Sequence, residues 1–513
     1  MSVTSPERRT AILLIGAALL ALAFLQATTV HGIGVEEDSV QYLSAADHLL
    51  RGQGLRVHWW DPGSQPFTHF PPGLVFGLAA LQRLGLSAEA AAWWLNGAAL
   101  VALTLISARL AQRAAPHSGH AGLFGGAAVL LSRDILAVHA MIWSEPLFLA
   151  LSMGALLATV RSIETDATRP ALVAGLLAGA AGLTRYVAPT VIGACVLSLA
   201  ILGAAPMARR LRRAAVVAVL SAAPLAAIIA WNARHGGSAT NRELVYHPMS
   251  ADHLLSAART VYHWFIPDGG WIEPAMLVAV GLAVVWVGAA WRRSRARPSF
   301  RATPVAGIVL VLFAMGYVAF LALSLTFVDA QSTPDERMLV PLVPVAAVLV
   351  VAVIAEGLGR AERRRASAAL GVLLVVAALV SVGAWASDTS RMGLGYSGPA
   401  WRESRLLARV RDLPPAAVIV SNHPAAIWYL LGREVVGVPR LANPNTMRPI
   451  PAFPERMAVV CHQADGGAFY AHFTSRPPAW FLPSLSETRR HWRSRPTVVA
   501  ADGVVDSIPA GCR

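Results

Sequence analysis

Long apolar runs separated by short polar segments dominate the chain. Eleven runs have the length of a bilayer crossing or come close to it, and they lie at 11–30, 88–110, 121–142, 145–160, 170–184, 186–204, 214–231, 274–291, 304–327, 338–357 and 367–386. A shorter run at 74–86 follows Pro71-Pro72 and is either a further crossing or a segment that re-enters on the same side. The pattern predicts an α-helical polytopic membrane protein with about 11 to 13 transmembrane helices.

The composition agrees with this class. The chain has 513 residues, of which 55% are hydrophobic and 14% charged, and its mean hydropathy is +0.53. A formal net charge of +14 would suggest nucleic-acid binding in a soluble protein. Here all 43 basic residues are Arg, and they gather in short loops, where they set orientation. Because there is no Lys, an anion must be bound by Arg, His or backbone N–H groups.

The Arg clusters predict the topology. They all fall on one side if 74–86 does not cross, and short cytoplasmic loops carry such clusters. The N-terminus is then cytoplasmic, and the opposite side receives 31–73, 142–145, 184–186, 232–273, 328–337 and everything after 387. We therefore expect a multi-pass protein of the cell (inner or plasma) membrane, with residues 1–386 forming the transmembrane part and 31–73 its first outer loop.

Residues 387–513 change character, because they are rich in Arg, Pro and His and contain only short apolar runs. Strands are predicted at 415–422, 457–461 and 497–500, and a helix at 425–431 that ends at Gly432. The pattern predicts a small extracytoplasmic α/β domain. Cys461 and Cys512 both lie in it, so a disulfide between them is permitted if the domain is outside.

Two acidic sites lie on the predicted outer side. Glu37 and Asp38 follow the first apolar run, and the helical spacing from Tyr42 to Leu50 predicts a surface helix that Asp38 caps. A fixed carboxylate suits a general base, although an acid beside a spanning helix is usually a solvated loop charge. Glu145 begins a predicted helix at the same face, where the helix dipole favours a carboxylate. Asp38 and Glu145 could form an acid/base or acceptor-binding pair.

Arg185 and Arg337 stand on the side where Arg is least expected. Either could simply extend its head group to the interface, but a guanidinium also offers a bidentate fork to phosphate. We favour phosphate binding for both. Nearby His and aromatic residues, His69 among them, form an interfacial belt by default, and some could stack on a sugar ring. No nucleotide-binding, zinc-helix or serine-nucleophile motif was found.

Five segments together resemble the GT-C glycosyltransferases of the protein O-mannosyltransferase and aminoarabinose transferase type, the bacterial family 39-like enzymes. The likeness covers roughly residues 10–390, and the tail resembles the outer domain of many bacterial members. The segments are Asp38-x-x-x-Tyr42-x-x-x-Ala46, Phe70-Pro71-Pro72-Gly73, Ser144-Glu145-Pro146-Leu147-Phe148, Leu183-Thr184-Arg185-Tyr186, and Glu336-Arg337-Met338-Leu339-Val340-Pro341-Leu342-Val343-Pro344.

The resemblance implies roles for these residues. It places the catalytic carboxylate on Asp38, with Glu37 as a rival because the usual Asp-Glu order is replaced here. It makes Glu145 the second-loop acid. Aminoarabinose transferases have a Lys before the loop Pro, where this chain has Phe70 beside His69, so donor-phosphate binding falls to Arg185 and Arg337. Tyr42, His69 and Tyr186 are the expected substrate contacts.

The implied activity is transfer of a sugar from a polyprenyl-phosphate donor to a glycan, lipid or protein acceptor, by inverting displacement. The resemblance implies no certain cofactor and leaves a divalent metal open, while the sequence offers no firm metal site. The alternative is a transporter or flippase of a lipid-linked or small solute. Transporters place polar residues near the bilayer midplane and are often built from repeated halves. Here the polar residues gather at one surface, which favours the enzyme.

Overall fold

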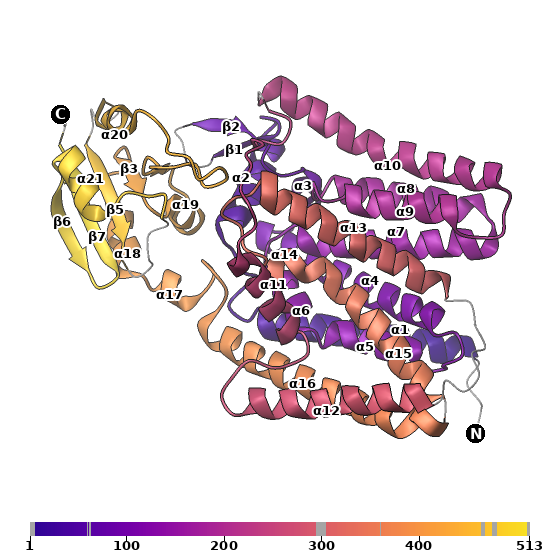
Figure 1. The fold of residues 1–513 in the computed structure, drawn as a ribbon. Helices are drawn as coiled ribbons and strands as arrows, with labels where there is room; N and C mark the ends of the chain where they lie inside the picture. Colours follow the sequence, from indigo (N-terminus) through magenta and orange to yellow (C-terminus); the bar gives the residue numbers. More distant parts are fainter. Residues whose placement is uncertain are drawn as a thin grey trace.

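The computed structural model describes residues 6–58, 60, 63–236, 238–293, 304–359, 361–462, 467–474 and 480–509. A bundle of long helices forms most of the protein, and a small domain with a β-sheet lies at one end of it (Figure 1). The N-terminus lies toward the opposite end of the bundle. We call the end that faces the small domain the domain-side end.

Each of the eleven predicted runs coincides with a helix or a broken helix. The bundle helices are α1 (Pro6–Thr28), α4 (Ala88–Ala114), α5 (Ala121–Leu130), α6 (Arg133–His139), α7 (Glu145–Thr165), α8 (Thr168–Gly182), α9 (Pro189–Ile201), α10 (Met207–His235), α12 (Ile272–Arg293), α13 (Val305–Phe327), α14 (Glu336–Leu339), η2 (Val340–Leu342), α15 (Val343–Leu358) and α16 (Ala361–Met392).

Length and apolarity qualify seven spans in the described residues as membrane crossings. The number becomes eight if α5 and α6, bent by 58°, count as one span. Helices α1, α8 and α9 match predicted runs but do not reach that standard over their described length. The larger predicted number of crossings therefore stays a prediction.

The run at 74–86 forms α3 (Gly73–Arg83), a helix of 11 residues. At 1.5 Å per residue it is roughly 16 Å long, about half the apolar thickness of a bilayer. It packs against α2 (Glu37–Leu50) of the first outer loop. The N–H of Gly73 donates to the carbonyl of Leu183 at 2.5 Å, where an added side chain would collide with that carbonyl. Its length favours the interpretation that 74–86 does not cross.

The first outer loop is more ordered than its sequence suggests. After α2 come the paired strands β1 (Arg56–His58) and β2 (Ser64–Pro66). The prediction that Asp38 caps the helix is wrong, because the cap is Glu36, whose N–H donates to the Ser39 hydroxyl at 3.0 Å. Asp38 lies instead in the first turn of α2, and its side chain pairs with Arg337 of the bundle.

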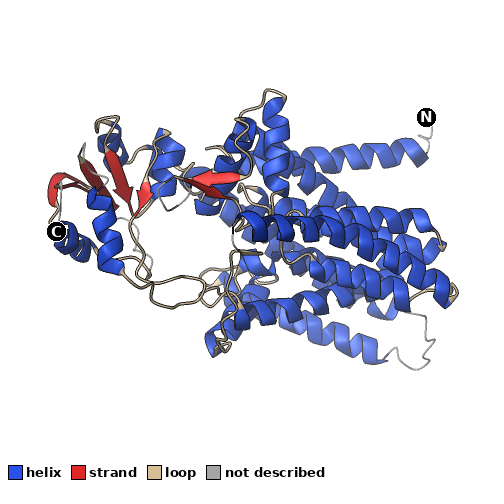
Figure 2. Ribbon diagram, turned by 90° about the horizontal axis from the view of Figure 1, so that it is seen from above, coloured by secondary structure: helices blue, strands red, loops and turns tan. Residues whose placement is uncertain are grey.

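The small domain contains a five-stranded sheet in the order β4-β3-β5-β7-β6. Strand β3 is parallel to β4 and β5, and β7 is antiparallel to both β5 and β6. Figure 2 shows these strands together at one end, with the helices of the bundle beyond them. Its elements are α17 (Pro399–Arg402), α18 (Arg405–Arg411), β3 (Val418–Ser421), α19 (Pro424–Leu431), β4 (Val436–Gly437), α20 (Phe453–His462), β5 (Ala468–Phe473), α21 (Leu485–Trp492), β6 (Arg495–Ala500) and β7 (Gly503–Ile508).

Most of the predicted elements of this domain are present. Helix α19 ends at Gly432, which takes the left-handed conformation with φ 64°. The strand predicted at 457–461 is wrong, because this segment belongs to α20. Met457 and Val460 are both buried, and their spacing of three is a helical one. The side chain of Cys461 and the whole of Cys512 lie outside the described residues, so the disulfide stays a prediction.

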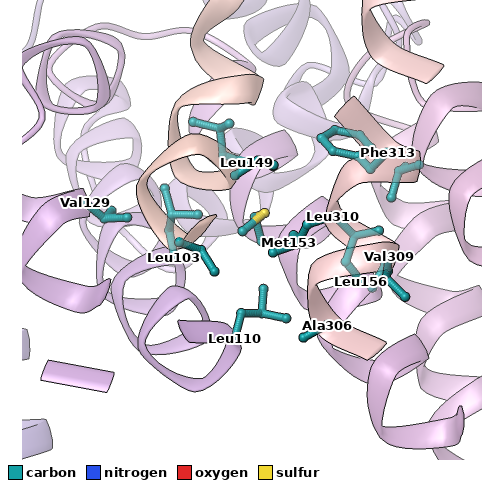
Figure 3. Packing of buried hydrophobic residues seen from close by; sticks show 14 of the residues in the cluster. Leu103, Leu110, Val129, Leu149, Met153, Leu156, Ala306, Val309, Leu310 and Phe313 are labelled. Carbon is teal, nitrogen blue, oxygen red and sulfur yellow. The ribbon is translucent and has the colours of Figure 1, made fainter. Parts of the chain in front are cut away.

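The bundle core is built mainly from aliphatic side chains, and the buried rings of Phe148, Phe313 and Tyr317 lie among them. Figure 3 shows Leu103 of α4, Met153 of α7 and Leu310 and Phe313 of α13 packed together. Small residues bring other helices closer: at Gly179 of α8, an added Cβ would lie 2.9 Å from the carbonyl oxygen of Leu220 in α10. Close packing of this kind holds transmembrane helices together. It fixes the helix ends on which the site is built.

Candidate active site

Four charged residues from distant parts of the chain meet at the domain-side end of the bundle. Arg337 of α14 donates from Nη1 to Oδ2 of Asp38 in α2, and from Nε to Oε1 of Glu145 in α7, both at 2.6 Å. Arg185, in the turn between α8 and α9, forms an ion pair with the same oxygen of Glu145. We call these four residues the charge cluster.

Local structure explains how each member is placed. Glu145 is the first residue of α7 and is followed by Pro146, so it lies at the positive end of a helix dipole. Asp335 caps α14 by accepting from the N–H of Met338 at 2.9 Å, which places Arg337 in the first turn. The Arg337 guanidinium carbon lies 4.2 Å from the centre of the Trp143 ring, and the planar cation gains from this contact.

The cluster has no net formal charge, since two carboxylates face two guanidinium groups. Pairing with an opposite charge lowers the free-energy cost of burying such groups away from water. The members differ in exposure: the Glu145 side chain is 0% exposed, whereas those of Asp38 and Arg337 are 29% and 27% exposed. Asp38 and the arginines are therefore accessible to a ligand. Glu145 is buried and fixes the two arginines by ion pairs on their inner side.

The other predicted contacts surround the cluster at different depths. Tyr42 is fully buried; its hydroxyl donates to the Ser144 hydroxyl at 3.2 Å and its ring stacks on Phe70 at 5.1 Å. It anchors α2 and does not face an open space. The Tyr186 hydroxyl donates to the carbonyl of Thr68 at 3.1 Å and accepts from Asn232 at 2.7 Å. Tyr186 thereby ties the first outer loop to the bundle.

Two ionisable groups near the cluster have unusual pKa values. Burial, the neighbouring Asp38 and Glu36 raise the pKa of Glu37 to about 7, and Arg440 opposes them. Burial, with a contribution from Arg242, lowers the pKa of His69 to about 4. Glu37 therefore titrates near neutral pH, and His69 is uncharged there. An uncharged imidazole can donate or accept a hydrogen bond but supplies no positive charge for a phosphate.

Sequence reasoning missed several neighbours of the site. Arg242 pairs with Asp329 at 3.3 Å; it is one more Arg on the predicted outer side, and the argument used for Arg185 would have found it. Trp143 precedes the Ser144-Glu145-Pro146 motif and could have been included with it. Arg440 comes from the C-terminal domain and carries no comparable signal. Among the described residues, no group of three or more His, Cys, Asp or Glu side chains could hold a metal ion.

No protein-family model and no curated protein sequence matches this chain. Among solved structures, it is similar to ArnT from Cupriavidus metallidurans bound to undecaprenyl phosphate, with 12% identity, a TM-score of 0.58 and coverage of 98% of both chains. The same protein in the apo state gives 12% identity, a TM-score of 0.59 and coverage of 99% of both chains. These likenesses extend over both the bundle and the small domain.

Two larger proteins share the architecture over part of their length. The Archaeoglobus fulgidus oligosaccharyltransferase matches with 12% identity and a TM-score of 0.50, over 90% of this chain and 67% of its own. The arabinofuranosyltransferase AftD from Mycobacteria matches with 14% identity and a TM-score of 0.55, over 100% of this chain and 42% of its own. At these identities, the likenesses establish the fold.

Proposed function

We propose that this chain, which has the GT-C fold of membrane glycosyltransferases, is itself a glycosyltransferase that takes a sugar from a polyprenyl-phosphate-linked donor. The observation that carries the proposal is the charge cluster, in which a partly exposed carboxylate and two arginines lie at one end of apolar helices. That is the machinery needed to activate a hydroxyl and to stabilise a departing lipid phosphate. A structure of the similar protein ArnT contains undecaprenyl phosphate.

In the proposed reaction Asp38 is the general base. Arg337 holds its Oδ2 atom, which leaves Oδ1 to accept the proton of an acceptor hydroxyl. The acceptor oxygen forms a bond to the anomeric carbon as the bond from that carbon to the phosphate oxygen breaks. Polyprenyl phosphate leaves with the electron pair, the proton passes to Asp38, and the anomeric configuration inverts. General-base catalysis contributes roughly 10²- to 10⁴-fold to such a step.

The two arginines would stabilise the leaving phosphate. A guanidinium has five N–H donors. Arg337 uses Nε and one Nη1 hydrogen in the cluster, so its other donors can reach a ligand. Glu145 pairs with both arginines and fixes where their free donors point, which lowers the entropic cost of binding the phosphate. With no Lys in the chain, arginine is the only permanently charged side chain available for this task.

An apolar cavity supports a donor with a long hydrocarbon chain. It has a volume of about 480 Å³ and lies between α5, α15 and α16, where it follows α15 from Val343 to Leu358, a distance of roughly 22 Å. Figure 1 shows α15 and α16 approaching each other toward the end that lies away from the small domain. Val343 is about two helical turns from Arg337. A lipid phosphate at Arg337 could therefore lay its isoprenoid chain along α15.

We place the active site on the extracytoplasmic side of a cell membrane, with the N-terminus in the cytoplasm. The Arg-rich loops support this orientation. The acceptor in this proposal is a glycan, lipid or protein hydroxyl on the same side. No metal step is needed for the displacement as written.

The test is sugar transfer by the purified protein in lipid, with a panel of radiolabelled polyprenyl-phosphate sugars and a membrane extract as acceptor. We expect Asp38→Asn to lower transfer by about 10³-fold while the protein still binds polyprenyl phosphate. Asp47→Asn is the matched control, because Asp47 lies on the same helix and only pairs with exposed Arg51. Failure of the wild-type protein to release polyprenyl phosphate from any donor would refute the proposal.

The rival function is transport of a lipid-linked or small solute without chemistry. It would be supported if lipid translocation in vesicles proceeded equally in the wild-type protein and in Asp38→Asn. The position of the charge cluster at one end of the helices, rather than midway along them, favours the enzyme.

A further inference from the structure

A buried amide of helix α4 holds the chain between α6 and α7, which we call the 139–143 turn. The side chain of Asn96 is 1% exposed. Its Nδ2 donates to the carbonyl of His139 at 2.8 Å and to that of Met141 at 2.7 Å. Asn96 lies roughly 12 Å along a helix that is long and apolar enough to cross a membrane. A polar side chain at such a depth is costly and therefore points to a specific role.

The two carbonyls set the orientation of this amide. Helix α6 ends at His139, and the last carbonyls of a helix have no partner within it, so buried ones must be paired elsewhere. Rotating the Asn96 amide by half a turn would place its Oδ1 against both carbonyl oxygens. Oδ1 is buried without a hydrogen-bond partner among the described residues. The two donated hydrogen bonds alone therefore orient the side chain, and they fix the path of the chain where it leaves α6.

The 139–143 turn carries an aromatic ring that contacts the charge cluster. The carbonyl of Met141 also accepts from the N–H of Trp143 at 2.9 Å, so one oxygen joins Asn96 to the backbone of Trp143. The centre of the Trp143 ring lies 4.2 Å from the guanidinium carbon of Arg337. The indole N–H has no hydrogen-bond partner in the described part of the chain, so backbone and packing set the position of the ring. Asn96 thus reaches Arg337 through Met141 and Trp143.

The same turn is tied to the loop that carries the proposed base. The N–H of Gly34 donates to the carbonyl of Ala140 at 2.7 Å, and the N–H of Ile142 donates to the carbonyl of Gly34 at 2.9 Å. An added Cβ at Gly34 would overlap the sulfur of Met141, so this close approach requires glycine. Gly34 precedes Asp38 by four residues. The 139–143 turn is therefore held by α4 on one side and bonded to the first outer loop on the other.

We propose that Asn96 is a positioning residue of the active site: by holding the 139–143 turn it places Trp143, and through that ring it aims Arg337 at the donor phosphate. This inference rests on the proposed function. There Arg337 binds the phosphate with the N–H donors that the charge cluster leaves free, and such donors stabilise a transition state only when they are aimed at the developing charge. A displacement of about 1 Å can cost about 10²-fold in rate. Asn96 itself does not touch the reacting atoms.

The experiment measures the affinity for a fluorescent polyprenyl phosphate, and sugar transfer, in the full-length protein and in Asn96→Leu. Both quantities are expressed per folded molecule, from the unfolding curve of each variant. We expect Asn96→Leu to bind about 10-fold more weakly and to transfer sugar about 10²-fold more slowly. Asn96→Asp, whose buried carboxyl group is neutral and keeps one donor, should lose less and carries the same test if Asn96→Leu does not fold. Thr104→Val is the matched control, because Thr104 is buried on the same helix and donates only to the carbonyl of Leu100.

A double-mutant cycle separates positioning from a purely structural role. In an Arg337→Gln background there is no guanidinium to aim, so adding Asn96→Leu should change the affinity less than about two-fold. An equal loss in both backgrounds, wild-type affinity in folded Asn96→Leu, or the same loss in Thr104→Val would overturn the inference. Wild-type protein that binds polyprenyl phosphate but transfers no sugar would refute the proposed function alone, because the affinity still tests Asn96. Wild-type protein that does not bind it would overturn both.

Discussion

Replacing Glu145 by Gln is expected to destabilise the protein by about 3 to 5 kcal/mol, the usual cost of removing one partner from a buried ion pair. Glu145 is fully buried and pairs with both Arg185 and Arg337. Gln has the same shape and can still accept a hydrogen bond, so the substitution tests the charge and not the packing.

The size of the expected destabilisation depends on which carboxylate partners each arginine keeps in Glu145→Gln. Arg337 keeps its pair with Asp38 at 2.6 Å, so it stays compensated. Arg185 has no other carboxylate partner among the described residues and would be left partly buried with its charge uncompensated. A single pair at about 4 Å is worth about 4 kcal/mol at an effective dielectric constant of 20. The expected loss therefore corresponds to one pair and not to two.

The assay is reversible unfolding in mixed micelles followed by tryptophan fluorescence. Glu164→Gln is the matched control, because Glu164 pairs with Arg113 and both side chains are about one-third exposed; the same substitution there should cost less than about 1 kcal/mol. Adding Arg185→Gln to Glu145→Gln should recover about 1 kcal/mol or more. Equal free energies of unfolding for Glu145→Gln and Glu164→Gln would refute the reasoning.

Three further expectations concern stability. The pKa of Glu37 is about 7 in the folded protein, against a reference value of 4.5. The contribution of Glu37 to stability therefore falls as pH rises from 4.5 through 7. Glu37→Gln should stabilise the protein by about 1 to 2 kcal/mol at pH 8 and leave its stability unchanged at pH 4, as measured by unfolding at each pH. The pKa of His69 is about 4 in the folded protein, against a reference value of 6.5. The free energy of unfolding should therefore fall as pH drops from 6.5 toward 4. A smaller fall over this pH range in His69→Gln would verify the prediction. In the small domain Arg489 donates to both oxygens of buried Asp506, at 2.7 and 2.9 Å; Arg489→Gln should lower the unfolding free energy by about 3 kcal/mol, whereas Arg490→Gln, at an exposed neighbour, should not.

Hydrophobic runs of bilayer length identified the bundle helices, and the expectation of a GT-C fold is confirmed. Short elements leave a weaker pattern in the sequence. The β1–β2 strands have three residues each, too few for a period of two to be recognised. The segment 457–461 is rich in apolar residues that favour strands. It forms a helix, in which the buried residues Met457 and Val460 are three positions apart. Helix α2 is capped by Glu36 and not by Asp38, because three consecutive acidic residues do not define where the helix begins.

The site could be predicted in part, because charge at the end of an apolar helix is costly and is kept for a reason. That argument selected Asp38, Glu145, Arg185 and Arg337, which the structure brings into one cluster. It could not predict the pairing, since Asp38 and Arg337 are 299 residues apart in the chain. Nor could it predict the hydrogen bond from the Trp60 indole to the carbonyl of Val438, which joins the first outer loop to the C-terminal domain across 378 residues.

The pairing of Asp38 with Arg337 implies competition between the proposed base and the donor phosphate. Both are anions that use the same guanidinium, so a phosphate bound at Arg337 draws its donors away from Asp38. The same competition predicts that Asp38→Asn binds polyprenyl phosphate more tightly than the wild-type protein, by about 5- to 30-fold for a gain of about 1 to 2 kcal/mol. Titration with a fluorescent polyprenyl phosphate measures this, with Asp47→Asn expected to match the wild-type protein; weaker binding by Asp38→Asn would show that Arg337 does not divide its donors between the two anions.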